Sequence, residues 1–93
     1  MKIIYSAESL DDLKRLRDFI AVHNPQTAGK VAAAILAGIK QLQTFPYLGV
    51  EVPQAPNPEV IRDLVIRKYV VRYFVDGEGV FILRIWHHRE DRL

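Results

Sequence analysis

Basic side chains recur through the last third of this 93-residue chain, within the apolar segment 61–91, IRDLVIRKYVVRYFVDGEGVFILRIWHHRED. Three runs rich in β-branched residues indicate three strands. The basic residues that we single out in or beside these runs are Arg62, Arg72, Arg84, His87, His88 and Arg89. A sheet that carries these cations is expected to meet an anionic partner or substrate.

These side chains could cleave RNA through its 2′-hydroxyl group. That reaction needs a base for the hydroxyl proton, an acid for the leaving oxygen and cations for the developing charge. His87 or His88 could act as the acid or the base, because imidazole titrates near neutral pH. Arginines such as Arg62, Arg72 and Arg84 could each bind phosphate oxygens through two hydrogen bonds. A catalytic set of these three arginines with His87 is therefore one hypothesis.

The same residues have structural alternatives. Arg62 and Asp63 could form an exposed strand pair, and Arg72 and Arg84 could pair with Asp63 or a helix carboxylate. His87 could hydrogen-bond to the backbone at the end of its strand. Like charges on facing strand residues are destabilising unless a carboxylate or an anion joins them. The sequence leaves both hypotheses open.

The end of the last strand also offers a candidate binding surface. Trp86 is expected either to pack in the core or rim of the sheet or to anchor an interface. We expect no metal at His87, His88 and Asp91, because adjacent side chains on a strand point to opposite faces. The chain has no cysteine, which excludes disulfides and thiolate-bound zinc, and we expect no cofactor.

Two helices and four strands are needed to position these residues. The expected elements are a strand at 1–5, a helix capped by Ser6 that ends near His23, a helix from Pro25 to about Thr44, and strands at 60–66, 69–75 and 80–86. The expected apolar stripes are Leu10, Leu13, Leu16 and Ile20 on the first helix and Val31, Ile35, Leu36, Ile39 and Leu42 on the second. The charged residues of the first helix, including Asp12, are expected on its opposite face. The short Asn24-Pro25 joint and the alanine-rich second helix predict a helical hairpin.

The register of the last hairpin decides how its charges group. A three-residue loop, 77–79, with Gly79 in the left-handed conformation, places Arg72 directly opposite Arg84. Tyr73 then joins Phe81, Leu83 and Ile85 in the core. A two- or four-residue loop places the two arginines on opposite faces, and we favour the three-residue loop.

Composition sets broader limits. A chain of 93 residues is expected to form one domain, 1–93, and no apolar run approaches the roughly 20 residues of a membrane span, so a cytoplasmic location is expected. The net charge is only +2. Segment 41–61 has no lysine or arginine, whereas segment 62–92 has seven, so an acidic partner would be drawn to the second segment.

The order of these phrases resembles the RelE/ParE superfamily of toxins from type II toxin–antitoxin systems. The resemblance extends over nearly the whole chain, through SAESLDDLKRLRDFI, the alanine-rich segment HNPQTAGKVAAAILAGIKQLQTFPYLG and the Arg-Asp-Leu, Tyr-x-x-x-Tyr and Leu-Arg-x-x-His strands. It implies an α+β fold of order β-α-α-β-β-β, in which a helical hairpin packs on one face of a small, mainly antiparallel sheet.

The resemblance further implies a toxin that a cognate antitoxin neutralises, with operator DNA bound only through the antitoxin. RelE-like toxins cut messenger RNA on the ribosome, whereas ParE-like toxins act on DNA gyrase and are not nucleases. We favour the ParE-like branch, because 41–61 lacks basic residues, no tyrosine follows Tyr73, and the sequence stops six residues after His87. A RelE-like endoribonuclease and a degenerate, non-toxic member remain the alternatives. The expected target- or antitoxin-binding residues are Arg62, Arg72, Arg84, Trp86, His87, His88, Arg89 and Arg92.

Overall fold

The computed structural model describes residues 1–90, so Asp91 and Arg92 of the expected site lie outside the described residues. The elements are β1 (Lys2–Tyr5), α1 (Ala7–His23), α2 (Pro25–Lys40), the 3₁₀ turn η1 (Gln41–Gln43), β2 (Val50–Glu51), β3 (Ile61–Ile66), β4 (Tyr69–Val75) and β5 (Gly79–His87). The expected order of strands and helices is confirmed, with the two-residue strand β2 as an addition. Within residues 1–90, no helix has both the length and the apolar character that a membrane span requires.

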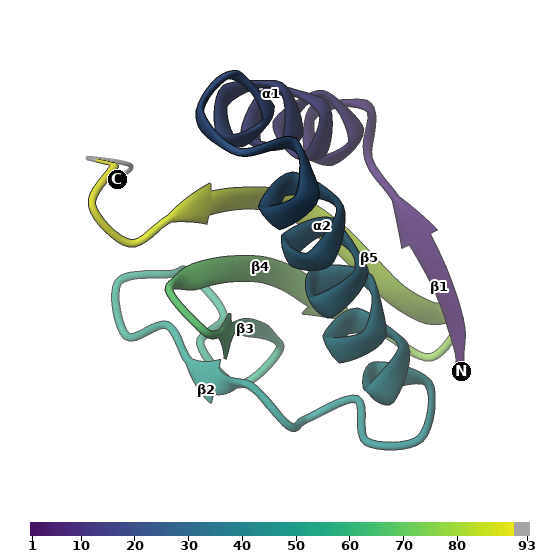
Figure 1. Ribbon diagram of the computed structural model, residues 1–93. Helices are drawn as coiled ribbons and strands as arrows, with labels where there is room; N and C mark the ends of the chain where they lie inside the picture. Colours follow the sequence, from purple (N-terminus) through teal and green to yellow (C-terminus); the bar gives the residue numbers. More distant parts are fainter. Residues whose placement is uncertain (91–93) are drawn as a thin grey trace.

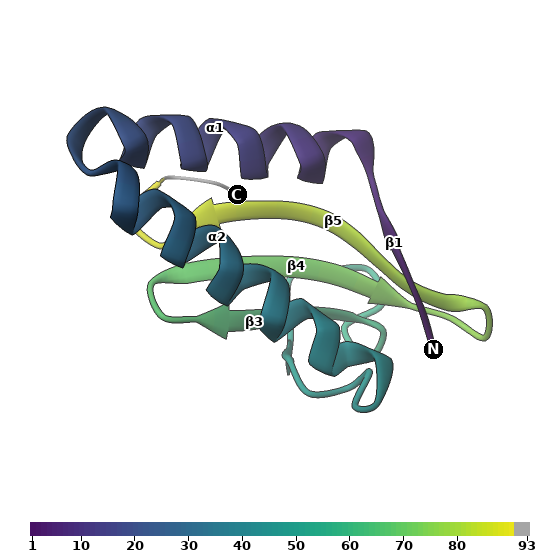
Figure 2. The ribbon, with the colours of Figure 1, turned by 45° about the vertical axis from the view of Figure 1, so that its right-hand side comes forward.

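The five strands form one sheet in the order β1-β5-β4-β3-β2, with β1 parallel to β5 and the other neighbours antiparallel. The helical hairpin packs on this sheet, with α1 along β5 and α2 across β4 and β3 (Figures 1 and 2). The α+β fold with a mainly antiparallel sheet is therefore confirmed. This order places the end of β5 beside α1.

Both helices begin at side-chain caps. The Ser6 hydroxyl accepts a hydrogen bond from the Ser9 amide at 3.0 Å, and the Asn24 side chain accepts one from the Thr27 amide at 3.2 Å. Pro25 occupies the first turn of α2, where its missing N–H costs nothing. The second helix ends at Lys40, four residues earlier than expected, and tightens into η1.

The buried faces of the helices differ in part from the expected stripes. Leu10 and Leu36 were expected in the core but are 52% and 44% exposed, whereas Ser9 and Asp12 are buried. Ser9 and Asp12 lie on the same side of α1 as Leu16, because residues three and four apart share a helix face. The expectation that Asp12 belongs to the solvent face is therefore wrong.

The core lies between the hairpin and the sheet. Its fully buried side chains include Ile35, Ile39 and Leu42 from the second helix region and Val71, Tyr73, Val75, Val80, Ile82 and Ile85 from the strands. The Tyr73 hydroxyl accepts a hydrogen bond from the Gly49 amide at 2.8 Å. This bond ties the loop before β2 to the core.

The hairpin between β4 and β5 brings Arg72 opposite Arg84, as expected, but by a different route. Val75 pairs with Val80, so the connection has four residues, 76–79, rather than three. An irregularity between Arg72 and Tyr73 then shifts the register by one residue and restores the pairing of the arginines. A β-bulge of this kind cannot be read from alternation of apolar residues.

The bulge also changes which β5 residues reach the core. Val80 and Ile82 are fully buried, whereas Phe81 and Leu83, which were expected there, are only half-buried. Gly79 does not adopt a left-handed conformation, because no glycine of residues 1–90 has a positive φ. Glycine is required there because a Cβ atom would lie 2.6 Å from the Lys2 carbonyl oxygen of β1.

Candidate functional site

The two facing arginines of the sheet are both bound by carboxylates. Arg72 Nε and Nη2 donate to the Asp63 carboxylate at 2.8 and 2.9 Å, and Arg84 Nε and Nη2 donate to the Asp12 carboxylate at 2.8 and 3.1 Å. The alternative in which these arginines pair with Asp63 and a helix carboxylate is therefore confirmed. Two like charges can face each other because each has its own counter-ion.

Arg62 clamps the loop that precedes β2. Its guanidinium donates to the Gly49 carbonyl at 2.9 Å and to the Tyr47 carbonyl at 3.4 Å, and lies 4.9 Å from the centre of the Tyr47 ring. Its Nε donates to the Glu59 carbonyl at 3.2 Å, and its side chain is only 17% exposed. The nearest carboxylate, that of Glu51, is 3.7 Å away. The three arginines of the hypothetical catalytic set thus already bind oxygen atoms of the protein.

Asp12 is the residue that sequence analysis missed. Besides Arg84, its carboxylate accepts the Ile85 amide at 2.8 Å and Arg15 Nη2 at 3.4 Å, and the residue is 4% exposed. Burial alone would raise the pKa of Asp12, but the hydrogen bonds from Arg84, the Ile85 amide and Arg15 hold that pKa below its ordinary value. Asp12 therefore joins α1 to the second half of β5. The only signal in the sequence is its spacing of four residues from Leu16.

Trp86 and His87 fill structural positions at the end of β5. Trp86 is 8% exposed, with the Arg72 guanidinium 5.1 Å from its ring centre, so the packing alternative is confirmed. The His87 ring meets the Tyr69 ring edge-on at 5.1 Å, and its Nδ1 atom accepts the Arg89 amide at 3.1 Å. The expected hydrogen bond between His87 and the backbone is therefore confirmed.

His88 lies beyond the last strand. The rings of His87 and His88 are 4.7 Å apart and tilted by 33°, so the expectation that they point to opposite faces is wrong. The reason is that β5 ends at His87 and the chain turns there. His88 instead pairs with the β3–β4 turn, where the Lys68 carbonyl accepts its amide at 2.8 Å.

This contact creates a cluster of exposed basic side chains that we call the basic corner, made of Arg67, Lys68, His88 and Arg89. Arg67 and Lys68 form the two-residue connection between β3 and β4, and Arg67 has a positive φ of 56°, the only such non-glycine among residues 1–90. Arg67 and Lys68 were not among the expected site residues. Their adjacency at a hairpin turn was the signal available.

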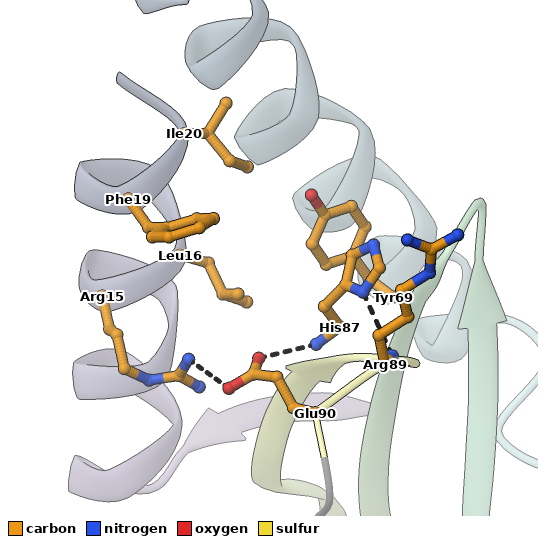
Figure 3. Close-up of a pocket in the computed structure, with 8 residues that line it drawn as sticks. All are labelled: Arg15, Leu16, Phe19, Ile20, Tyr69, His87, Arg89 and Glu90. Carbon is orange, nitrogen blue, oxygen red and sulfur yellow. Dashed lines mark hydrogen bonds and ion pairs between the residues drawn. The ribbon is translucent and has the colours of Figure 1, made fainter. Parts of the chain in front are cut away.

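A groove of about 600 Å³ lies beside the basic corner. Figure 3 shows its lining, which comes from α1, the start of β4, the end of β5 and the chain after it: Arg15, Leu16, Phe19, Ile20, Tyr69, His87, Arg89 and Glu90. Its α1 wall is apolar, and Phe19 on that wall is 67% exposed. An apolar wall with cations at its edges suits a partner segment that carries both apolar and acidic side chains.

The neighbours of His87 shift its pKa. Burial, and then the charges of His88, Arg89 and Lys68, lower the pKa of His87 below its ordinary value, and Glu90 opposes them. The charged or titratable groups that face His87 are Lys68, Tyr69, His88, Arg89 and Glu90. The folded protein therefore favours the neutral ring, whose Nδ1 lone pair accepts the Arg89 amide.

We expect acid to loosen the chain after β5. The stability that this neutral ring contributes is present above the unfolded pKa of about 6.5 and is lost as the pH falls below it toward the folded pKa. Protonated His87 has no lone pair on Nδ1, so the Arg89 amide should lose protection from hydrogen exchange in mildly acidic buffer. NMR-detected exchange checks this, with the buried Val71 amide as the internal control. Equal loss of protection at both amides, or none at Arg89, would contradict the expectation.

A solved structure shares this fold, and two curated proteins match this chain over nearly their whole length. The structure described as the chromosomal ParDE TA system from P. aeruginosa superimposes with a TM-score of 0.80 at 25% identity, covering 94% of this chain and 95% of that chain. Toxin RelE2 of Caulobacter vibrioides is 29% identical over 86 residues, which is 92% of this chain and 93% of RelE2. Toxin RelE1 of the same organism is 27% identical over 90 residues, which is 97% of this chain and 96% of RelE1. These similarities define a toxin of the RelE/ParE superfamily.

A family model narrows this class. The model for the ParE toxin of the type II toxin–antitoxin system, parDE, matches residues 3–92. The chain therefore belongs to the ParE toxin family, and the expected RelE/ParE membership is confirmed. Membership in a toxin–antitoxin family implies an antitoxin as partner.

Proposed function

We propose that this toxin inhibits DNA gyrase by binding and is not an enzyme. The observation that carries the proposal is which basic residues are bound within the protein and which are exposed. Arg62, Arg72 and Arg84 bind internal oxygen atoms, whereas the cations of the basic corner project into solvent. Such a distribution suits recognition of an acidic surface on a protein target better than the gripping of a scissile phosphate.

The arrangement supports binding over RNA cleavage for a chemical reason. A phosphate-binding arginine needs free N–H groups, because the phosphate must compete with any carboxylate already bound. Arg72 and Arg84 would each leave a hydrogen-bonded carboxylate uncompensated if they moved to a substrate. His87, the candidate acid or base, has its Nδ1 atom occupied by the Arg89 amide. Phosphate binding by Arg72 or Arg84 would require their carboxylate pairs to break first, and His87 would have to act through Nε2.

The second candidate function is a ribosome-dependent messenger RNA endoribonuclease of the RelE-like type. Its support is that the two curated relatives are both named RelE toxins, at 29% and 27% identity. The exposed His88 and Arg89 could contribute to such a reaction. A degenerate member that retains only antitoxin binding would show neither activity.

We further infer that the cognate antitoxin neutralises the toxin through the groove of Figure 3. An amphipathic segment could place apolar side chains against Leu16, Phe19 and Ile20 and carboxylates near Arg89 and the basic corner. Such a segment would cover the surface proposed to contact gyrase. Operator DNA would then be bound by the antitoxin rather than by this chain.

The proposal is tested by removing the exposed charge at the end of β5. For the double variant His88→Ala/Arg89→Ala, half-inhibition of purified gyrase is expected to need a toxin concentration at least about tenfold higher, since the variant loses two polar contacts, one of them from a cation. DNA supercoiling is the measurement. Arg17→Ala, which removes an exposed α1 cation that does not line the groove, should inhibit like the wild type. If the double variant inhibited gyrase as well as the wild type does, the basic corner would not be part of the gyrase-binding surface.

A further inference from the structure

The chain after β5 forms a built turn rather than a loose end. All four amide N–H groups of residues 87–90 have acceptors: His87 donates to Glu90 Oε1 at 2.9 Å, His88 to the Lys68 carbonyl at 2.8 Å, Arg89 to His87 Nδ1 at 3.1 Å, and Glu90 to the His87 carbonyl at 2.8 Å. Segments near a chain end are usually poorly ordered unless they are tied down. Here the ties are specific, so the turn 87–90 has one defined shape.

The Glu90 carboxylate is the centre of these ties. One oxygen, Oε1, accepts the His87 amide and closes the turn, and the other, Oε2, accepts Arg15 Nη1 of α1 at 2.6 Å (Figure 3). Arg15 Nη2 reaches Asp12 Oδ1 and the Ile85 carbonyl, both at 3.4 Å. The 2.6 Å contact between Arg15 and Glu90 is short, as charge-assisted hydrogen bonds are, and such bonds are stronger than neutral ones. Arg15 and Glu90 therefore connect the turn to the Asp12 cluster that joins α1 to β5.

The connection fixes how the turn meets a partner. His88 and Arg89 are exposed, and within residues 1–90 the Arg89 side chain makes no hydrogen bond or ion pair. Their backbone amides, by contrast, are both hydrogen-bonded. A rigid backbone that carries free side chains binds with a smaller loss of conformational entropy than a flexible segment would.

We propose that Glu90 and Arg15 are positioning residues for the effector surface. They hold the turn 87–90 in the shape that presents His88 and Arg89 to the target, without themselves contacting it. The inference rests on the proposed function, because it names what positions the surface that would bind gyrase. It adds two residues on different elements, neither of which the basic corner includes.

If Arg15 and Glu90 mainly stabilised the whole fold, loss of Glu90 would lower the global unfolding midpoint. The Arg15 and Glu90 side chains are 38% and 29% exposed, and pairs as exposed as this contribute little to global stability. Loss of Glu90 should therefore leave the global unfolding midpoint nearly unchanged. It should instead release the local turn, which lowers affinity for the target and protection of the turn amides.

The experiment compares Glu90→Ala, Glu90→Gln and Arg15→Ala with the control Arg17→Ala. Arg17 pairs with Asp18 at 3.7 Å on the same helix and is 56% exposed, so its loss controls for removal of a surface charge. Two readouts are made on the full chain: hydrogen exchange at the amides of residues 87–90, and the toxin concentration that half-inhibits gyrase supercoiling. The first reports the turn itself, and the second reports its function.

We expect Glu90→Ala to expose the His87 and Glu90 amides to exchange and to raise the half-inhibiting concentration about tenfold. Glu90→Gln keeps one acceptor oxygen and should lie between the wild type and Glu90→Ala. The Arg15→Ala/Glu90→Ala double variant should be little worse than Glu90→Ala alone in both readouts, because Arg15 reaches the turn through its contact with Glu90. Arg17→Ala should match the wild type in both readouts.

Wild-type exchange at the turn amides of Glu90→Ala, or wild-type inhibition by that variant, would overturn the proposal. Strict additivity of Arg15→Ala and Glu90→Ala would also overturn it, since the residues would then act separately. If the wild-type toxin itself fails to inhibit gyrase, the proposed function falls and takes the effector role with it. In that case the exchange data still decide whether Glu90 and Arg15 shape the turn.

Discussion

Asp12→Ala is expected to lower the free energy of unfolding by about 2–4 kcal/mol. The substitution leaves the Ile85 amide without its acceptor and removes the partner that Arg84 binds through two hydrogen bonds. Arg84 can turn partly toward water, because its side chain is 42% exposed, so the loss should stay below that of a fully buried pair. Urea denaturation measures the effect as a lower midpoint at an unchanged slope.

Asp11→Ala is the matched control, since Asp11 precedes Asp12 on α1 but is exposed. Its free energy of unfolding should lie within about 0.5 kcal/mol of the wild-type value.

The pH dependence of stability provides a second check on Asp12. Because the folded pKa of Asp12 is lowered, the stability it contributes is present above its unfolded pKa and is lost as the pH falls through the folded pKa. The difference in unfolding free energy between the wild type and Asp12→Ala should therefore narrow in strong acid. No difference at neutral pH would contradict the role of Asp12.

Phe19→Asp is expected to weaken antitoxin binding by about 2 kcal/mol, or about thirtyfold. Phe19 lies on the α1 wall of the groove and is 67% exposed, so the variant should fold normally. A carboxylate there would remove an apolar contact and repel an acidic partner segment. Titration calorimetry with the purified antitoxin gives the affinity.

Val22→Asp is the matched control for the groove. Val22 is 81% exposed and lies one turn further along α1, outside the groove lining. It introduces the same charge into the same helix and should bind the antitoxin like the wild type. Equal weakening by both variants would assign the effect to helix charge, and tight binding by Phe19→Asp would place the antitoxin elsewhere.

The fold was accessible from the sequence because its local signals agree with one another. The Ser6 and Asn24 caps, the Asn24-Pro25 joint and the three β-branched runs each specify an element that the structure contains. The packing of a helix against a sheet edge is less accessible. In the sequence, Asp12 resembles a solvent-facing residue, because its partners, the Ile85 amide and Arg84, come from β5, more than 70 residues away.

The site was accessible only in part. The pairing of Arg72 with Asp63 was one of two alternatives that the residues themselves allowed, and only coordinates could choose between them. The bulge at Arg72 was hidden because one extra residue in β5 compensates for one extra residue in the connection. The basic corner was hidden because Lys68 and His88 are 20 residues apart and meet only through strand pairing.

The central claim is that the toxin acts on gyrase by binding, without cutting RNA. The most direct measurement adds the purified toxin to a gyrase supercoiling reaction and, in parallel, to a translation reaction whose messenger is analysed by primer extension. We predict inhibited supercoiling or trapped, cleaved DNA, together with an intact messenger. A messenger cut at codon positions with gyrase unaffected would contradict the account and would favour the catalytic set of Arg62, Arg72, Arg84 and His87.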